Sequence, residues 1–189
     1  VQPALYPKLP YDLTRDFAFI TQITSGPGIL VVNPALPIKS VPEFIAYARA
    51  RPGQVTFGSA GSGAPSHLAV ELLKTMAKIY VVHIPYKGMA PALTDAIGGQ
   101  IQFSLPTIAA GLPLARAGKL RALAVTSAQP SALMPGLPSV AASGLPGYAS
   151  AVISGFLAPA KTPPDIVARL NREIVAVLGR ADVRERLLS

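Results

Sequence analysis

The sequence contains no cysteine, no tryptophan and only two histidines. The lack of cysteine excludes disulfides, thiolate zinc sites and cysteine nucleophiles. Two isolated histidines do not make a metal site, and neither a metal nor a cofactor is expected. Long apolar runs are missing too, because Pro, Gly, Lys or Gln interrupts every stretch before the roughly 18 residues that would span a bilayer.

Acidic residues are scarce, with nine Asp and Glu against 17 Lys and Arg and a formal net charge of +8. Most of the nine fall at helix starts or on predicted solvent faces, which argues against paired catalytic carboxylates. The basic residues are dispersed and only 6% of residues are aromatic, so no nucleic-acid partner is expected. The charge is equally consistent with a solvated surface and with a field that draws small anions into a cleft.

The composition is that of a globular protein, and 189 residues fit one or two folding units. Short β-branched runs alternate with helical patterns between residues 28 and 125, which predicts a parallel sheet with helices on both faces. Ser40 followed by Glu43 is a capping-box pattern that predicts one helix start. Strands are expected at 28–33, 55–57, 80–84, 101–103 and 121–125, and further helices at 66–77, 91–97 and 108–117.

The last third of the sequence predicts a connection followed by a strand and a long helix. Residues 127–147 are dominated by Pro, Gly, Ser and Ala, with at most a short helix at 138–142. A strand is expected at 151–158, and an amphipathic helix begins near Thr162. Val1 to Ala4 have neither the basic head nor the apolar segment of an export signal, so any such signal is expected to have been removed or to lie upstream. Both ends of the chain are expected to be cut from a longer protein.

Ser59 to His67 is the most informative stretch, because glycines alternate with serines between a predicted strand and a predicted helix. Such a loop aims backbone N–H groups and hydroxyls at an anion on the helix N-terminus. It lacks the Lys-Ser/Thr of a phosphate-binding loop and the G-x-G-x-x-G of dinucleotide folds. An ordinary tight turn fits the same residues, so both interpretations stay open.

The two histidines allow an alternative to a binding site. His67 lies in the first turn of the predicted helix, where it could donate to a bound carboxylate, although a lone histidine there is more often structural. His83 is expected in or beside the sheet. No G-x-S-x-G nucleophile elbow occurs. A hydrolase or isomerase that uses Ser59 or Ser62 with His67 remains the alternative.

Several sequence segments spread along nearly the whole chain carry a resemblance to a known family: residues 1–12, 59–63 with 67–69, 85–88, 117–127, 144–148 and 157–160. On these segments the chain resembles the Bug-type extracytoplasmic solute receptors of tripartite tricarboxylate transporters. The resemblance implies the type II periplasmic-binding-protein fold, the Venus-flytrap arrangement of two α/β lobes with mainly parallel sheets. Residues 1–27 and 151–189 would belong to an incomplete first lobe and residues 28–150 to the second. The crossing strands would be 28–33 and 151–158.

The resemblance also implies a ligand site on the second lobe and no catalytic residues. Two departures from many relatives bear on the ligand: Ala64 replaces a threonine, and Ile153-Ser154 replaces an aromatic pair before Gly155. The implied ligand-binding residues are Ser59, Ala60, Gly61, Ser62, Gly63, Ala64, Ser66, His67 and Thr107.

The function implied by the resemblance is that of a periplasmic receptor and not of an enzyme. It would capture a small organic acid, such as a dicarboxylate, a tricarboxylate, an acidic or amide amino acid or an aromatic acid. The receptor, expected to be a monomer, would deliver this ligand to the membrane subunits of a transporter. A ligand sensor for a signalling partner is a further alternative.

Overall fold

The computed structural model describes residues 8–131 and 134–188. It contains two compact units, unit 1 from Val1–Ser25 with Ile153–Ser189 and unit 2 from Gly26–Val152. The chain passes from unit 1 to unit 2 along β1 (Phe17–Pro27) and returns along β7 (Ala151–Pro159). Within the described ranges no helix has the length and apolar character needed to cross a membrane. The lobe boundaries expected from the sequence stay a prediction.

Unit 2 is built on a five-stranded sheet with the order β4-β3-β5-β2-β6. β3 runs parallel to β4 and to β5, as expected, but β2 runs antiparallel to both of its neighbours, so the sheet is mixed. The reason is that β2 begins beside the end of β5. An isolated antiparallel bridge joins Gly28, just before β2, to Thr107, which follows β5. The strands are β2 (Ile29–Val32), β3 (Thr56–Ser59), β4 (Val82–Pro85), β5 (Phe103–Ser104) and β6 (Arg121–Val125).

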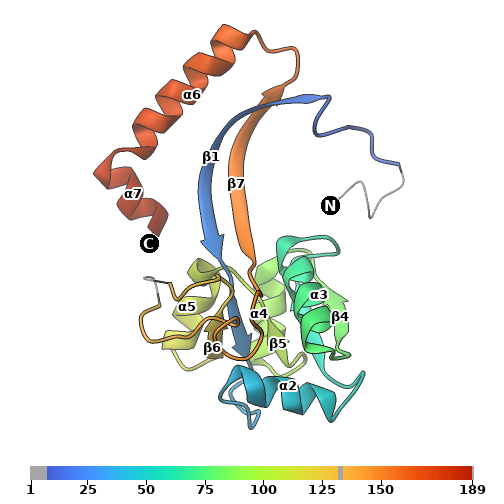
Figure 1. Ribbon diagram of the computed structural model, residues 1–189. Coiled ribbons are helices and arrows are strands. Elements are labelled where there is room, and N and C mark those ends of the chain that lie inside the picture. The colour runs from blue at the N-terminus through green and yellow to red at the C-terminus, as the bar shows by residue number, and fades with distance from the viewer. Residues whose placement is uncertain (1–7, 132–133, 189) are drawn as a thin grey trace. The chain divides into compact units, whose positions relative to one another are not determined.

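Helices cover both faces of this sheet, which confirms the expected layering (Figure 1). They are α2 (Val41–Arg49), α3 (Pro65–Ala77), α4 (Met89–Ile97) and α5 (Ile108–Arg116). Side chains along β2 alternate between the faces. Leu30 and Val32 join the core under α2 and α3, whereas Ile29 and Val31 join the core under α4 and α5.

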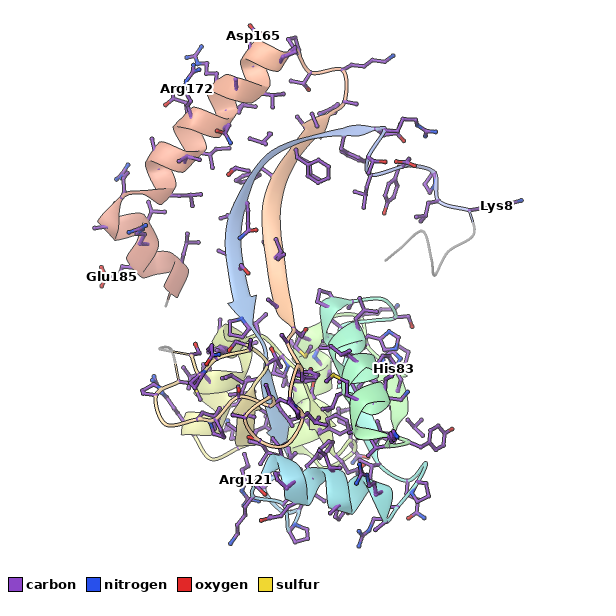
Figure 2. All side chains as sticks on the ribbon, viewed as in Figure 1. Lys8, His83, Arg121, Asp165, Arg172 and Glu185 are labelled. Carbon is purple, nitrogen blue, oxygen red and sulfur yellow. The ribbon has the colours of Figure 1, made fainter. Side chains whose placement is uncertain are left out.

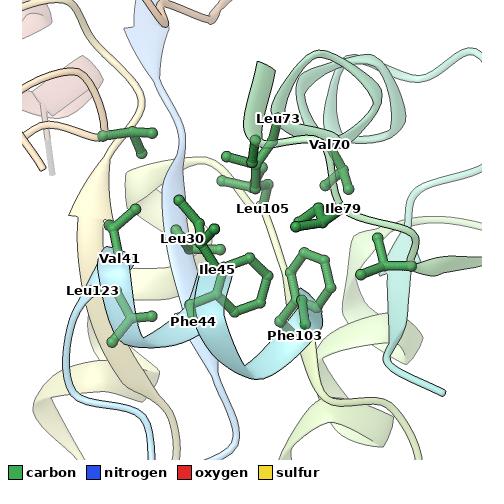
Figure 3. Packing of buried hydrophobic residues seen from close by; sticks show 14 of the residues in the cluster. Leu30, Val41, Phe44, Ile45, Val70, Leu73, Ile79, Phe103, Leu105 and Leu123 are labelled. Atoms are coloured by element: carbon green, nitrogen blue, oxygen red, sulfur yellow. The ribbon is translucent and has the colours of Figure 1, made fainter. Parts of the chain in front are cut away.

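The larger core is anchored by aromatic side chains (Figure 3). Phe44 from α2 meets Phe103 from β5 edge to face, with ring centroids 4.7 Å apart. α2 begins at the predicted capping residue, since the Ser40 hydroxyl accepts a hydrogen bond from the Glu43 N–H. The Glu43 carboxylate accepts from the Lys39 N–H instead of the Ser40 N–H that a full capping box uses. The hydrogen bond at Ser40 and the packing of Phe44 in the core therefore both stabilise the first turn of α2.

The chain enters and leaves unit 2 at one buried hydroxyl. The Thr126 Oγ1 accepts a hydrogen bond of 2.6 Å from the Gly28 N–H and donates one of 2.7 Å to the Ser150 carbonyl. The residue is 1% exposed, so no water replaces these bonds. Thr126 thus ties the first residues after β1 to the last residues before β7. Residues 138–142 belong to the expected connecting stretch and contain turns but no helix, and the Ser139 hydroxyl accepts a hydrogen bond from the Ala142 N–H.

Unit 1 pairs β1 with β7 and adds α6 (Pro164–Leu178) and α7 (Ala181–Leu188). β1 was not expected from the sequence, and the passage between the units lies in β1 instead of residues 28–33. The two strands run in opposite directions (Figure 1). They approach each other closely at Gly155, where an added Cβ would lie only 2.8 Å from the Thr21 carbonyl oxygen. α6 follows the expected amphipathic helix, but none of its residues is buried within the described part of the chain.

Replacing Thr126 with valine should lower the free energy of unfolding by about 1–3 kcal/mol, because it leaves the Gly28 N–H and the Ser150 carbonyl without their partner. Urea unfolding followed by circular dichroism measures the change. The matched control is Thr94→Val, since the Thr94 hydroxyl donates to the Ala90 carbonyl on an exposed part of α4. That control should stay within about 0.5 kcal/mol of the native protein. Equal effects of the two substitutions would contradict the role given to Thr126.

Candidate functional site

Three parallel strands bring the sequence-predicted site residues to one edge of the sheet. Ser59 at the end of β3 pairs with Pro85 at the end of β4, and Gly58 pairs with Ser104 at the end of β5. We call this edge the carboxyl edge. Beyond it begin α3, after Ala64; α4, after Gly88; and α5, after Thr107. The loop from Ser59 to His67 and the distant residue Thr107 therefore meet the same edge, where ligands bind in open α/β sheets.

The starts of these three helices share an electrostatic property. No side chain caps the N-terminus of α3, α4 or α5, and none of the three carries an acidic residue in its first turn. α2 has both, in Ser40 and Glu43. The first N–H groups of a helix lack intrahelical partners and hold a partial positive charge. That charge is not neutralised by capping side chains at the carboxyl edge, which suits an anion.

The opposite ends of two of these helices are capped by side chains. The Arg49 guanidinium donates to the Ala77 carbonyl at the end of α3, with 2.7 Å from Nη2 to the oxygen. The Asn33 amide donates to the Ala96 carbonyl near the end of α4, at 2.7 Å. The carbonyl ends are thus satisfied within unit 2 while the N–H ends are left open.

The glycine loop is held by its own hydrogen bonds. The N–H groups of Ala60, Gly61 and Gly63 donate to the Ser66 hydroxyl, the Ser59 hydroxyl and the His67 Nδ1. Gly61 and Gly63 have φ angles of +130° and +78°, which only glycine adopts without strain.

These internal bonds decide which donors of the loop are available. The N–H groups of Ala60, Gly61 and Gly63, expected to face an anion, are instead occupied within the loop. No described residue accepts a hydrogen bond from the N–H of Ser62 or Ser66, and the exposed Ser62 hydroxyl has no partner among the described residues either. The donors open to a ligand are therefore Ser62 and the first turn of α3. At α5, the exposed Thr107 side chain makes no capping bond.

His67 fixes the loop from the first turn of α3. Because its Nδ1 accepts from the Gly63 N–H, the neutral ring carries its proton on Nε2, which lies 3.5 Å from the Glu71 carboxylate. Both nitrogens thus face groups of the protein, in line with the structural interpretation of this histidine. Neither Ser59 nor Ser62 is hydrogen-bonded to His67.

His83 is the residue that sequence reasoning missed. Its Nε2 lies 2.6 Å from the Oγ of the fully buried Ser59, and its ring stacks on His67 with centroids 3.9 Å apart. Figure 2 labels His83 beside α3. The only local signal is that His83 follows the alternating pattern of β4. Its partner Ser59 lies on a different strand, so the contact is set by the β3–β4 register.

The surroundings of His83 favour its neutral form. Burial lowers the pKa of His83 below its ordinary value of 6.5, and the neighbouring His67 and Lys74 lower it further, while Glu71 opposes them. A neutral His83 keeps its contact with Ser59 and its stack on His67 without a buried charge.

The comparisons with known proteins agree with the geometry. Residues 1–188 match the family described as Tripartite tricarboxylate transporter family receptor. Protein BugT of Bordetella pertussis is 35% identical over 182 residues, which are 96% of this chain and 56% of BugT. The chain therefore spans little more than half the length of this relative.

Two solved structures are similar over almost the whole chain. A protein from R. palustris solved with adipate has a TM-score of 0.92 at 37% identity and covers 97% of this chain and 61% of its own. MatC from Rhodopseudomonas palustris with bound malate has a TM-score of 0.89 at 31% identity, over 98% and 63%. The expected fold class is confirmed. The family is one of receptors, so the hydrolase alternative is not supported.

Stability should depend on pH through His83. The native pKa of His83 lies below the value of about 6.5 in the unfolded chain. Between these two pKa values the unfolded state binds more protons than the native state, so the free energy of unfolding increases as the pH rises. Stability is therefore lost as pH falls through about 6.5 towards the lower native pKa. His83→Gln, which has no titrating group, should flatten this part of a pH series of urea unfolding curves. An unchanged slope in the variant would contradict the assignment.

Proposed function

The chain belongs to the tripartite tricarboxylate transporter receptor family, and on this premise we propose that it forms the ligand-binding part of a periplasmic receptor for a small carboxylate. The observation that supports this most strongly is the carboxyl edge, where three uncapped helix N-termini without acidic residues meet. We further propose that residues 28–150 are the lobe that holds this site. Residues 1–27 and 151–189 would contribute to the other lobe.

The proposed ligand contacts are made by few donors. One carboxylate would accept hydrogen bonds from the Ser62 N–H and hydroxyl and from the Ser66 N–H, at the start of α3. Ala60, Gly61, Gly63 and His67 would position this loop without touching the anion, and Ala64 would leave the place of a capping side chain to the ligand. An anion at one helix N-terminus is worth about 0.3–1 kcal/mol when exposed and up to about 2 kcal/mol when partly buried.

A ligand with two carboxylates suits the site better than one with a single carboxylate. Three helix starts offer more than one anion position, and Thr107 at the start of α5 provides a second hydroxyl next to the entry of β2. Two similar proteins were solved with dicarboxylates, adipate and malate. We therefore propose a dicarboxylate, which the protein would hand to the membrane subunits of a transporter.

Calorimetry on the purified protein tests the proposed function. A dicarboxylate such as adipate or malate should bind, whereas the matching uncharged diamide should not, because it offers no negative charge to the helix starts. Binding of the diamide with equal affinity would contradict the electrostatic basis, and a lack of binding across a panel of organic acids would contradict the function.

Ala64→Asp should change stability and ligand affinity in opposite directions. Ala64 has the extended backbone of an N-cap, with φ −64° and ψ 154°, so an aspartate there can accept from the first N–H groups of α3. Such a cap stabilises by about 0.5–2 kcal/mol. It also occupies the donors and places a negative charge where the ligand carboxylate binds.

The matched control is Ala64→Asn, which caps α3 without a charge. It should give a similar gain in the thermal midpoint and a smaller loss of affinity than the aspartate. If Ala64→Asp binds the dicarboxylate as tightly as the native protein, the ligand does not use the start of α3.

A further inference from the structure

A cavity lies in unit 2 at the opposite end of β6 from the carboxyl edge. β6 begins there at Arg121, which pairs with Val32 at the end of β2. The cavity has a volume of about 440 Å³ and opens to the surface between the end of α5, the start of β6 and the segment after β2. Its walls combine two arginines, Arg116 and Arg121, with the apolar side chains of Leu112, Leu120, Ala122 and Met134.

Arg121 is only partly satisfied by the protein. Its Nη1 donates to the carbonyls of Leu36 and Ile38, at 3.0 and 2.8 Å, and its Nη2 donates to the carbonyl of Pro34 at 3.1 Å. Three of the five N–H donors of the guanidinium are used, which holds the half-buried side chain beside α2 (Figure 2). The Nε–H and one Nη2–H have no acceptor among the described residues. This edge of a guanidinium matches the two oxygens of a carboxylate.

Among the described residues, neither arginine has an acidic partner. No described Asp or Glu forms an ion pair with Arg116 or Arg121, and the exposed Arg116 makes no hydrogen bond with a described residue. The C-terminal end of α5 offsets part of the Arg116 charge, since Arg116 lies in its last turn. Arg121 is neutralised only by carbonyl dipoles, so the cavity favours an anion.

We propose that this cavity is a second binding site, which takes a monocarboxylate with an apolar chain. The carboxylate is held side-on by the Nε–H and Nη2–H of Arg121 and by the charge of Arg116. The apolar chain lies on Leu112, Leu120, Ala122 and Met134. The site is separate from the carboxyl edge, and its ligand binds whether or not a dicarboxylate is bound there.

Nitrogen-15 NMR of the 189-residue chain tests the site, with octanoate below its micelle-forming concentration as the probe. The Arg121 Nε–H resonance should shift in a saturable way, and octanol at the same concentrations should leave it unmoved because octanol has no charge. An absent shift, or an equal response to octanol, would overturn the proposal. Shifts confined to the backbone amides of Ser62 and Ser66 would also overturn it, since they would place octanoate at the carboxyl edge.

Arg116→Ala checks the second positive charge without disturbing the fold, because its side chain has no bonded partner among the described residues. Octanoate should bind this variant about tenfold more weakly, the loss expected for one charge-assisted contact. Arg51→Ala removes one exposed arginine just after α2, outside the cavity, and should leave the affinity unchanged. Equal affinities of the two variants would overturn the role of Arg116.

Discussion

The structure of unit 2 depends on how it satisfies the ends of its helices. A helix leaves its first N–H groups and last carbonyls without intrahelical partners, and each must find a side chain, water or a ligand. The carbonyl ends of α3 and α4 are covered by Arg49 and Asn33. The N–H ends of α3, α4 and α5 have no side-chain cap and lie along the edge where three parallel strands end. This difference between the two ends of the helices is the basis for the proposal that the carboxyl edge binds an anion.

The glycine loop reaches its shape through contacts that join α3, β3 and β4. Gly63 is fixed by His67, His67 stacks on His83, and His83 meets the buried hydroxyl of Ser59. In this chain of contacts the His67 Nδ1 is the acceptor for the Gly63 N–H and so carries no proton. The loop is therefore shaped before any ligand arrives, which lowers the conformational entropy lost on binding.

Sequence reasoning succeeded where the signals were local. The capping box at Ser40, the glycine loop and the βα alternation predicted α2, α3 and the two faces of the sheet. It failed where distant pairing decides the structure. Sequence reasoning assigned no strand to residues 17–27, yet pairing with β7 makes them β1. The antiparallel direction of β2 and the contact between Ser59 and His83 likewise follow from the pairing of strands that are distant in the sequence.

Backbone amide NMR of this chain during titration with adipate tests the central claim, that the open helix starts at the carboxyl edge bind a carboxylate. The account predicts that the amide resonances of Ser62 and Ser66 move downfield with adipate and stay in place with adipamide. The resonances of Ala60, Gly61 and Gly63, whose N–H groups are already hydrogen-bonded, should move less. Adipate-dependent shifts that leave Ser62 and Ser66 unchanged would contradict the account.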